Sequence, residues 1–228
     1  MKRFSLLSTV VLLFCGIAFS FSQDSSGDAN ALFIRIFKYE DQLEIWEQKR
    51  AGEQFKKKKT ISICAASGIL GPKRKQGDQQ VPEGFYRISH FNPNSKYHLS
   101  LRINYPNQSD KIRTTNAANP GGDIMIHGGC ASIGCVAIGN NKIEYLYDLL
   151  KQQKANGQQT FPVHIFPCKM NALRYDVLKY VKRKDNKLID FWEELEGGFN
   201  YFESNRQVPN MLITPKGDYQ FEEEQPLL

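Results

Sequence analysis

Alternating apolar and polar residues fill the first two thirds of the chain, and this period of two is typical of β-strands. In the first run, residues 32–37, three aliphatic side chains alternate with Phe, Arg and Phe. The runs that predict strands are residues 32–37, 43–47, 60–65, 85–91, 97–105, 123–127 and 161–168. Gly and Pro concentrate in residues 68–84, which predicts a long loop there.

A helical period replaces this alternation in two places. The first predicted helix has Asn140 or Asn141 as its N-cap, and Gly157 closes it. Its apolar stripe consists of Ile143, Leu146, Tyr147 and Leu150. From Met170 the pattern is again helical but more polar, and it ends in a short predicted strand (PKGDYQF) and an acidic tail. The order predicts a mostly β fold with α additions and a C-terminal helical extension.

The N-terminus has the composition of a secretory signal. Lys2 and Arg3 precede an apolar run that ends at Ala18, and small residues follow at suitable cleavage positions. The run is short for a membrane span, although an uncleaved anchor is the alternative. We therefore expect residues 1–22 to be a signal peptide and residues 23–30 a polar linker, with no membrane-spanning segment in the mature chain.

The charge balance narrows the possible partners. A net charge of +6 favours an anionic partner, such as nucleic acid, an anionic membrane or an acidic polymer. Because an exported protein rarely meets nucleic acid, we expect no nucleic-acid partner. The lysine run at residues 56–59 is interpreted as the solvated edge of a strand rather than a polymer-binding patch.

The segment DIMIHGGCASIGCVAIGNN, residues 123–141, carries the candidate chemistry. His127 ends a predicted strand, and the glycines after it allow a sharp turn that brings Cys135 back towards it. A free thiol is only a few per cent thiolate at neutral pH, and an imidazole can take its proton. The pattern predicts Cys135 as nucleophile and His127 as base. The predicted oxyanion donors are the backbone N–H groups of Ser132, Ile133, Gly134 and Cys135.

Spacing alone leaves other interpretations of the cysteines open. Cys130 and Cys135 could form a disulfide, bind a metal together with His127, or only pack in the loop. Structural zinc sites usually repeat tighter Cys pairs, and no second pair is present. Cys64 and Cys168 could form another bridge, because sequence does not determine connectivity.

The block IHGGCASIGC resembles the active-site signature of the L,D-transpeptidase catalytic domain family (YkuD-type), and more narrowly its YafK-like branch. Other blocks resemble that branch in the same order, among them SGILGPKRKQGD, VPEGFYRI, FNPNSKYHLSLRINYPN and FPVHIFPC. The resemblance implies a YkuD-type mixed β-sheet sandwich of two sheets around an active-site groove. It places the catalytic domain at residues 31–169 and the helical extension at residues 170–228.

The resemblance also implies an activity. Members act on peptidoglycan stem peptides outside the cytoplasm, so a periplasmic or other extracytoplasmic location is expected. Cys135 would form a thioacyl-enzyme with a stem peptide, His127 would be the base, and an amine or water would take the acyl group. No cofactor and no metal are expected, and the sequence does not predict an oligomeric state.

This sequence departs from the broad family at two positions. The family usually reads Ser-His-Gly-Cys followed by an apolar residue and Arg, whereas this chain has Ile133 and Ala137 in place of that His and Arg. The YafK-like branch shares this pattern. Another group must then hold an acidic stem. His98 and Arg102 are candidates unless their strand face is simply solvated, and Tyr86 lines either the groove or the core.

The sequence is also compatible with two alternative functions. A hydrolase or amidase would detach protein or peptide from the stem by way of the same thioacyl-enzyme. A non-catalytic wall-binding module would retain the groove without turnover, a reading that the missing His and Arg permit.

Overall fold

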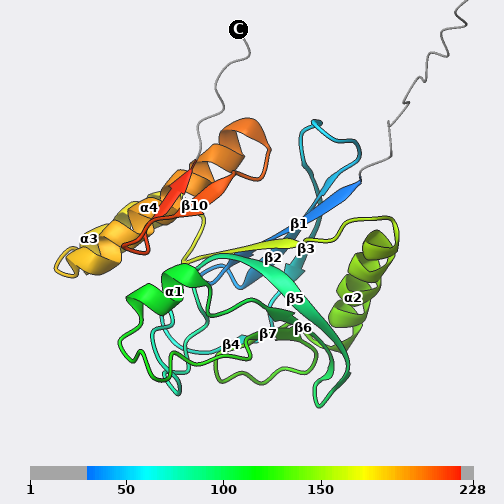
Figure 1. Cartoon of the computed structure of the whole chain (residues 1–228), viewed down its shortest axis with the longest axis horizontal. Coiled ribbons are helices and arrows are strands. Elements are labelled where there is room, and N and C mark those ends of the chain that lie inside the picture. The colour runs from blue at the N-terminus through cyan, green and yellow to red at the C-terminus, as the bar shows by residue number, and fades with distance from the viewer. Residues whose placement is uncertain (1–29, 222–228) are drawn as a thin grey trace, which may run out of the picture.

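The computed structural model describes residues 30–221 and folds them around one large mixed sheet (Figure 1). The strands are β1 (Ala31–Phe37), β2 (Gln42–Gln48), β3 (Lys56–Ser62), β4 (Ala65–Ala66), β5 (Gly84–Ser95), β6 (His98–Ile103), β7 (Met125–His127), β8 (Val136–Ala137), β9 (Pro162–Phe166), β10 (Met211–Ile213) and β11 (Tyr219–Phe221). The helices are α1 (Gln108–Arg113), α2 (Asn140–Ala155), α3 (Leu173–Lys182) and α4 (Asn186–Asn205). The predicted signal peptide, nearly all of the predicted linker and the acidic tail lie outside the described residues.

Nine strands pair in the order β3-β2-β1-β9-β5-β6-β7-β8-β4. The β1–β9 and β7–β8 pairs are parallel and the others are antiparallel. The first residues of β5 pair with β9, from Gly84 opposite Ile165, and its later residues pair with β6. The two mixed sheets implied by the resemblance are therefore two halves of one hydrogen-bonded sheet that share β5. The predicted mostly β fold is confirmed.

Both faces of the sheet are covered, which explains why β1 is apolar on both sides. Ile34 and Ile36 pack in a core with the predicted stripe of α2, whose four apolar side chains are all buried. Phe33 and Phe37 point to the opposite face, where aromatic side chains of α4 cover them. In Figure 1, α2 lies on one side of the strands and α3 and α4 lie on the other.

The C-terminal residues form the predicted helical extension and pack onto the sheet. Trp192 of α4 is fully buried, and the β10–β11 hairpin contacts the same helix. A Cβ at Gly198 would lie 2.6 Å from the Phe85 ring and 2.7 Å from the Phe221 ring, so only glycine permits this close approach. No helix between residues 30 and 221 is long and apolar enough to cross a bilayer.

Two predicted boundaries move by four residues, each because of strand pairing. β3 begins at Lys56 rather than at residue 60, because the lysines themselves pair with β2. β3 is the last strand of its half and these lysines are exposed, which agrees with a solvated edge. β5 continues to Ser95 through the predicted turn, because Ser95 pairs with His98.

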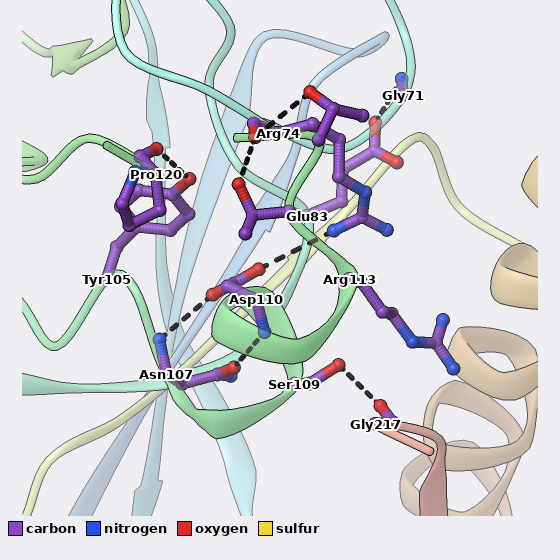
Figure 2. A network of polar contacts seen from close by, with 12 residues as sticks. Gly71, Arg74, Glu83, Tyr105, Asn107, Ser109, Asp110, Arg113, Pro120 and Gly217 are labelled. Atoms are coloured by element: carbon purple, nitrogen blue, oxygen red, sulfur yellow. Dashed lines mark hydrogen bonds and ion pairs between the residues drawn. The ribbon is translucent and has the colours of Figure 1, made fainter. Parts of the chain in front are cut away.

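Figure 2 shows how α1 joins the long loop of residues 71–83 to the C-terminal hairpin. The Asp110 carboxylate accepts hydrogen bonds from the Asn107 N–H and lies 3.8 Å from the Arg74 guanidinium. On the other side of the helix, the Ser109 hydroxyl donates to the Gly217 carbonyl at 2.6 Å. These contacts hold the loop in place, and residues of this loop form one wall of the cavity beside β7.

Candidate active site

A cavity of about 470 Å³ lies beside β7 and is lined by both Cys135 and His127. The volume is in the usual range for sites that hold small organic ligands, which is about 300–1,000 Å³. Ile133 and Gly134 of the predicted loop also line it.

The pairing of β7 with β8 puts the two predicted catalytic side chains on one face. Ile126 is opposite Val136, and both are buried in the core. Because side chains alternate along a strand, Cys135 and His127, one residue before and one after these positions, point to the other face. The Met125 N–H donates to Cys135 Sγ at 3.4 Å, which fixes the thiol beside β7.

His127 is held as a neutral base. Its Nδ1 lies 2.5 Å from the Gly128 carbonyl oxygen, and since a carbonyl only accepts, Nδ1 carries the proton and Nε2 keeps a lone pair. The Tyr97 ring covers the imidazole with a centroid distance of 4.6 Å. Burial lowers the pKa of His127, although the Gly128 hydrogen bond opposes this shift. The imidazole is therefore ready to accept a proton at neutral pH.

Cys135 is half-buried and is a free thiol. Burial raises the pKa of Cys135, the Met125 N–H lowers it, the Asp123 carboxylate raises it and the Lys73 ammonium lowers it. The net shift is upward, so the thiol stays protonated at neutral pH until a base takes its proton. This site consequently requires a neighbouring base such as His127.

The cysteine pairing differs from both bridges considered from the sequence. Cys64 is bonded to Cys130, with their Cα atoms 5.4 Å apart, so neither the Cys130–Cys135 nor the Cys64–Cys168 bridge is present. The Cys64 N–H donates to the Ala137 carbonyl, which brings the segment after β3 against β8 and the loop of residues 128–135. The bridge ties that loop to the β3–β4 connection and removes Cys130 from any metal site with Cys135.

Ser132 organises the turn before Cys135 instead of lining the cavity. Its hydroxyl donates to the Cys135 carbonyl at 2.7 Å and accepts from the Gly134 N–H at 3.2 Å. The Gly134 N–H is thus already engaged, and φ of +131° at this residue suits glycine alone. Within the predicted oxyanion set, the N–H groups of Ile133 and Cys135 remain as the expected donors.

Asn140 does not cap α2, because its side chain forms a hydrogen bond with the loop that follows His127. Gly139 occupies the N-cap position, and Asn140 Oδ1 accepts from the Gly129 N–H at 2.8 Å. A Cβ at Gly128 would lie 2.7 Å from that oxygen and 2.5 Å from the Tyr97 carbonyl. Gly128 is therefore needed for close approach of the backbone, and Gly129 suits its φ of +67°.

The substrate-binding residues predicted from the sequence, Tyr86, His98 and Arg102, do not line this cavity. Tyr86 is buried, and its single hydroxyl proton lies between two acceptors, the Glu83 carbonyl at 3.0 Å and Asp110 Oδ1 at 3.2 Å. His98 contacts Glu144 at 2.5 Å on the surface. Arg102 lies 3.1 Å from Asp123, which does line the cavity, so Arg102 reaches its rim only through that carboxylate. Ser100, on the same strand face, does line the cavity.

Lys73 also lines the cavity, although it was not among the site residues predicted from the sequence. It comes from the loop of residues 68–84, and its side chain is only 4% exposed. Its Nζ donates to Asp78 Oδ1 at 2.6 Å and to the Lys75 carbonyl at 2.9 Å, which fixes the cation at the cavity wall. The only sequence signal was its position within a block that resembles the YafK-like branch.

The described residues 30–221 contain no group of three or more His, Cys, Asp or Glu side chains that could hold a metal ion. The arrangement is a thiol, a neutral imidazole with its lone pair available, and one fixed cation in a small cavity. Such a set can carry out acyl transfer through a thioester.

Residues 34–165 match the family model described as YkuD, the L,D-transpeptidase catalytic domain. The chain is 35% identical over 184 residues to YafK of Escherichia coli K12, and equally to YafK of Escherichia coli O157:H7. The match covers 80% of this chain and 70% of the relative, whose name assigns it only provisionally to the L,D-transpeptidases.

Two solved structures show a more distant likeness. The helical cell shape determining protein Pgp2 from Campylobacter jejuni is 20% identical, with 81% of this chain and 73% of that chain covered and a TM-score of 0.47. L,D-transpeptidase 1 from Mycobacterium tuberculosis is 12% identical, with 60% and 62% covered and a TM-score of 0.35.

Proposed function

Because this chain belongs to the L,D-transpeptidase catalytic domain family, we propose that it is an exported enzyme that transfers peptidoglycan stem peptides through a thioester at Cys135. The observation that carries the proposal is the pairing of β7 with β8, which puts a free thiol and a neutral imidazole in one cavity. Export rests on the predicted signal peptide and on the extracytoplasmic position of peptidoglycan.

The proposed reaction has two half-reactions, the formation of the thioester and its transfer. His127 Nε2 takes the proton from Cys135 Sγ as the sulfur attacks the carbonyl carbon of the bond that follows the diamino acid. The N–H groups of Ile133 and Cys135 stabilise the oxyanion. When the tetrahedral intermediate collapses, the C–N bond breaks and the imidazolium protonates the leaving D-residue amine. An amine or water then attacks the thioester, His127 takes its proton, and the thiol is restored.

Lys73 supplies the cation that the family's missing Arg would otherwise provide. Ala137, at that Arg position, is buried and carries no charge. The Lys73 ammonium is the fixed cation that lines this cavity, and stem peptides carry carboxylates. We therefore assign to Lys73 the binding of a stem carboxylate and partial stabilisation of the Cys135 thiolate.

Replacement of Lys73 by methionine is expected to lower kcat/KM at neutral pH about tenfold, the usual cost of losing one hydrogen bond to a charged group such as the stem carboxylate. Loss of the cation raises the pKa of Cys135 further, so the acid limb of the pH profile moves to higher pH and activity recovers in alkaline solution. The measurement is kcat/KM against pH. Lys75→Met, which removes an exposed lysine of the same loop, is the control. Coincident profiles for Lys73→Met and wild type would contradict the assignment.

The proposed function is tested with defined muropeptides and mass spectrometry of both the products and the intact protein. A thioacyl adduct, together with a joined stem, shows transpeptidation, whereas an adduct with a shortened stem shows hydrolysis. Release of a stem-linked protein or peptide would identify the detaching activity instead. Binding of muropeptides without any adduct or product would refute the enzyme and support a wall-binding module.

A further inference from the structure

Helix α3 carries an exposed apolar face that the proposed function does not use. The face consists of Leu173, Val177, Tyr180 and Val181, which are 79%, 53%, 66% and 62% exposed. Their spacing places them on one side of the helix. The other side packs onto α4 through the buried Tyr175 and the half-buried Leu178. Single exposed apolar side chains are ordinary, but four on the same side of one helix are not.

Positive charge surrounds this face. Residues 173–187 contain six Lys or Arg and two Asp, a net +4, while the whole chain has a net charge of +6. Arg174 pairs with Glu40 and Lys179 with Glu196. The remaining four cations are Lys182, Arg183, Lys184 and Lys187, and no carboxylate between residues 30 and 221 forms an ion pair with any of them. The Arg183 guanidinium lies 4.1 Å from the Tyr180 ring centroid, at the edge of the apolar face.

The position of α3 separates this surface from the cavity. In Figure 1 the helix lies at the outer end of α4, away from β6 and β7, which carry the cavity. None of the four apolar residues or the four unpaired cations lines the cavity. A partner can therefore cover α3 while substrate reaches Cys135.

We propose that the α3 face docks onto an anionic phospholipid surface. A helix with an apolar ridge and flanking lysines and arginines lies in the plane of the headgroups, where the ridge enters the acyl boundary and the cations meet lipid phosphates. With ten residues, α3 lies on a bilayer and does not span it. Charge argues against a second copy of this chain as the occupant, because each copy would bring its four unpaired cations towards those of the other. An acidic polymer would match the charge but would leave the apolar ridge uncovered.

The test is co-sedimentation of the chain from Gln23 onward with vesicles. This chain keeps every described residue and omits the predicted signal peptide, which could bind lipid by itself. Strong binding is expected to vesicles of phosphatidylglycerol and phosphatidylethanolamine, and weak binding to phosphatidylcholine alone. Added salt is expected to weaken the binding.

Matched variants distinguish the contribution of the apolar α3 face from that of positive charge alone. Val177→Ser with Val181→Ser is expected to weaken binding roughly tenfold or more without a change of charge. Leu212→Ser, at a residue of β10 that is 57% exposed, is its control and should bind as wild type does. Neutralising Lys182, Arg183 and Lys184 to Gln should also weaken binding. The same change at Lys56, Lys58 and Lys59 of β3 should have a smaller effect.

Several outcomes would overturn the proposal. One is an equal loss of binding from the α3 and β3 charge variants. Another is a concentration-dependent dimer that the Val177→Ser, Val181→Ser variant abolishes, because a second copy would then cover the face. Binding to isolated peptidoglycan but not to vesicles would identify an acidic polymer. Vesicle binding only by a chain that ends at Phe221 would show that the acidic tail covers the face. Muropeptide turnover, measured in parallel, should stay unchanged in every variant, so a failed docking proposal leaves the proposed function standing.

Discussion

Replacement of Cys135 by alanine is expected to lower turnover of a stem-peptide substrate by about 10⁴-fold or more, to the background rate. The thioester requires a sulfur nucleophile, and Cys135 is the free thiol that lines the cavity with His127. Removing the nucleophile removes both half-reactions, so no acceptor rescues the variant. The measurements are kcat/KM with a defined muropeptide and the intact mass after incubation with a carbapenem-class β-lactam, which should add to wild type and not to the variant.

Cys168→Ala is the matched control for that experiment. Cys168 is also a free thiol, but it is fully buried and does not line the cavity. Burial raises the pKa of Cys168 to about 12, so it remains a thiol at neutral pH. This variant should retain turnover and the covalent adduct. Undiminished turnover by Cys135→Ala would contradict the proposed mechanism. Equal muropeptide binding with no turnover by either wild type or Cys135→Ala would favour the wall-binding module.

The meeting of Cys135 and His127 in one cavity could be predicted because the two residues are close in the sequence. Eight residues separate the two, a strand holds one end, and glycines permit the turn between them. Lys73 could not be predicted in the same way, because it reaches the cavity from a loop whose path depends on the fold. The Asp78 carboxylate fixes that path by accepting from the Arg74 and Lys75 N–H groups as well as from Lys73.

The disulfide also could not be predicted from the sequence, because the fold brings its two cysteines together. Cys64 and Cys130 are 66 residues apart in the sequence, and they meet because β4 pairs with β8. That pair has only two residues on each strand, Ala65 and Ala66 opposite Ala137 and Val136, and no hydrophobic period marks a strand so short. Spacing in the sequence left the Cys130–Cys135 and Cys64–Cys168 bridges open, and the fold forms neither of them.

The turn predicted before β6 is misplaced because strand pairing outweighs the turn preference of the residues themselves. Asn92, Pro93, Asn94 and Ser95 are residues that favour turns, yet β5 continues through them. The pairing register with β6 shifts between Asn92 and Ser95, and such an irregularity accommodates a proline that cannot donate to the ladder. Tertiary pairing here overrides local preference, and it moves the turn to Lys96 and Tyr97. Tyr97 is thereby placed against His127.

Replacement of Glu83 by glutamine is expected to lower the free energy of unfolding by about 3–5 kcal/mol, the usual cost of breaking a buried ion pair from one side. Glu83 is 0% exposed. Its Oε1 accepts from the Lys38 ammonium at 2.9 Å and from the Gly71 N–H at 2.7 Å, and its Oε2 accepts from the Trp192 indole at 2.8 Å. Glutamine keeps the shape but offers one acceptor oxygen and one donor, and it leaves Lys38 buried with its charge uncompensated. The measurement is urea unfolding followed by tryptophan fluorescence.

Glu47→Gln is the control for this prediction, because Glu47 also pairs with a lysine at 2.9 Å, but at the exposed edge formed by β3. Exposed pairs contribute about 0–1 kcal/mol, so the control should unfold nearly as wild type does. Equal losses in the two variants would contradict the importance of burial. The three bonds of Glu83 join β1, the loop that carries Lys73, and α4. Glu83→Gln should therefore loosen the cavity wall as well, and kcat/KM should fall at urea concentrations that leave wild type and Glu47→Gln fully folded.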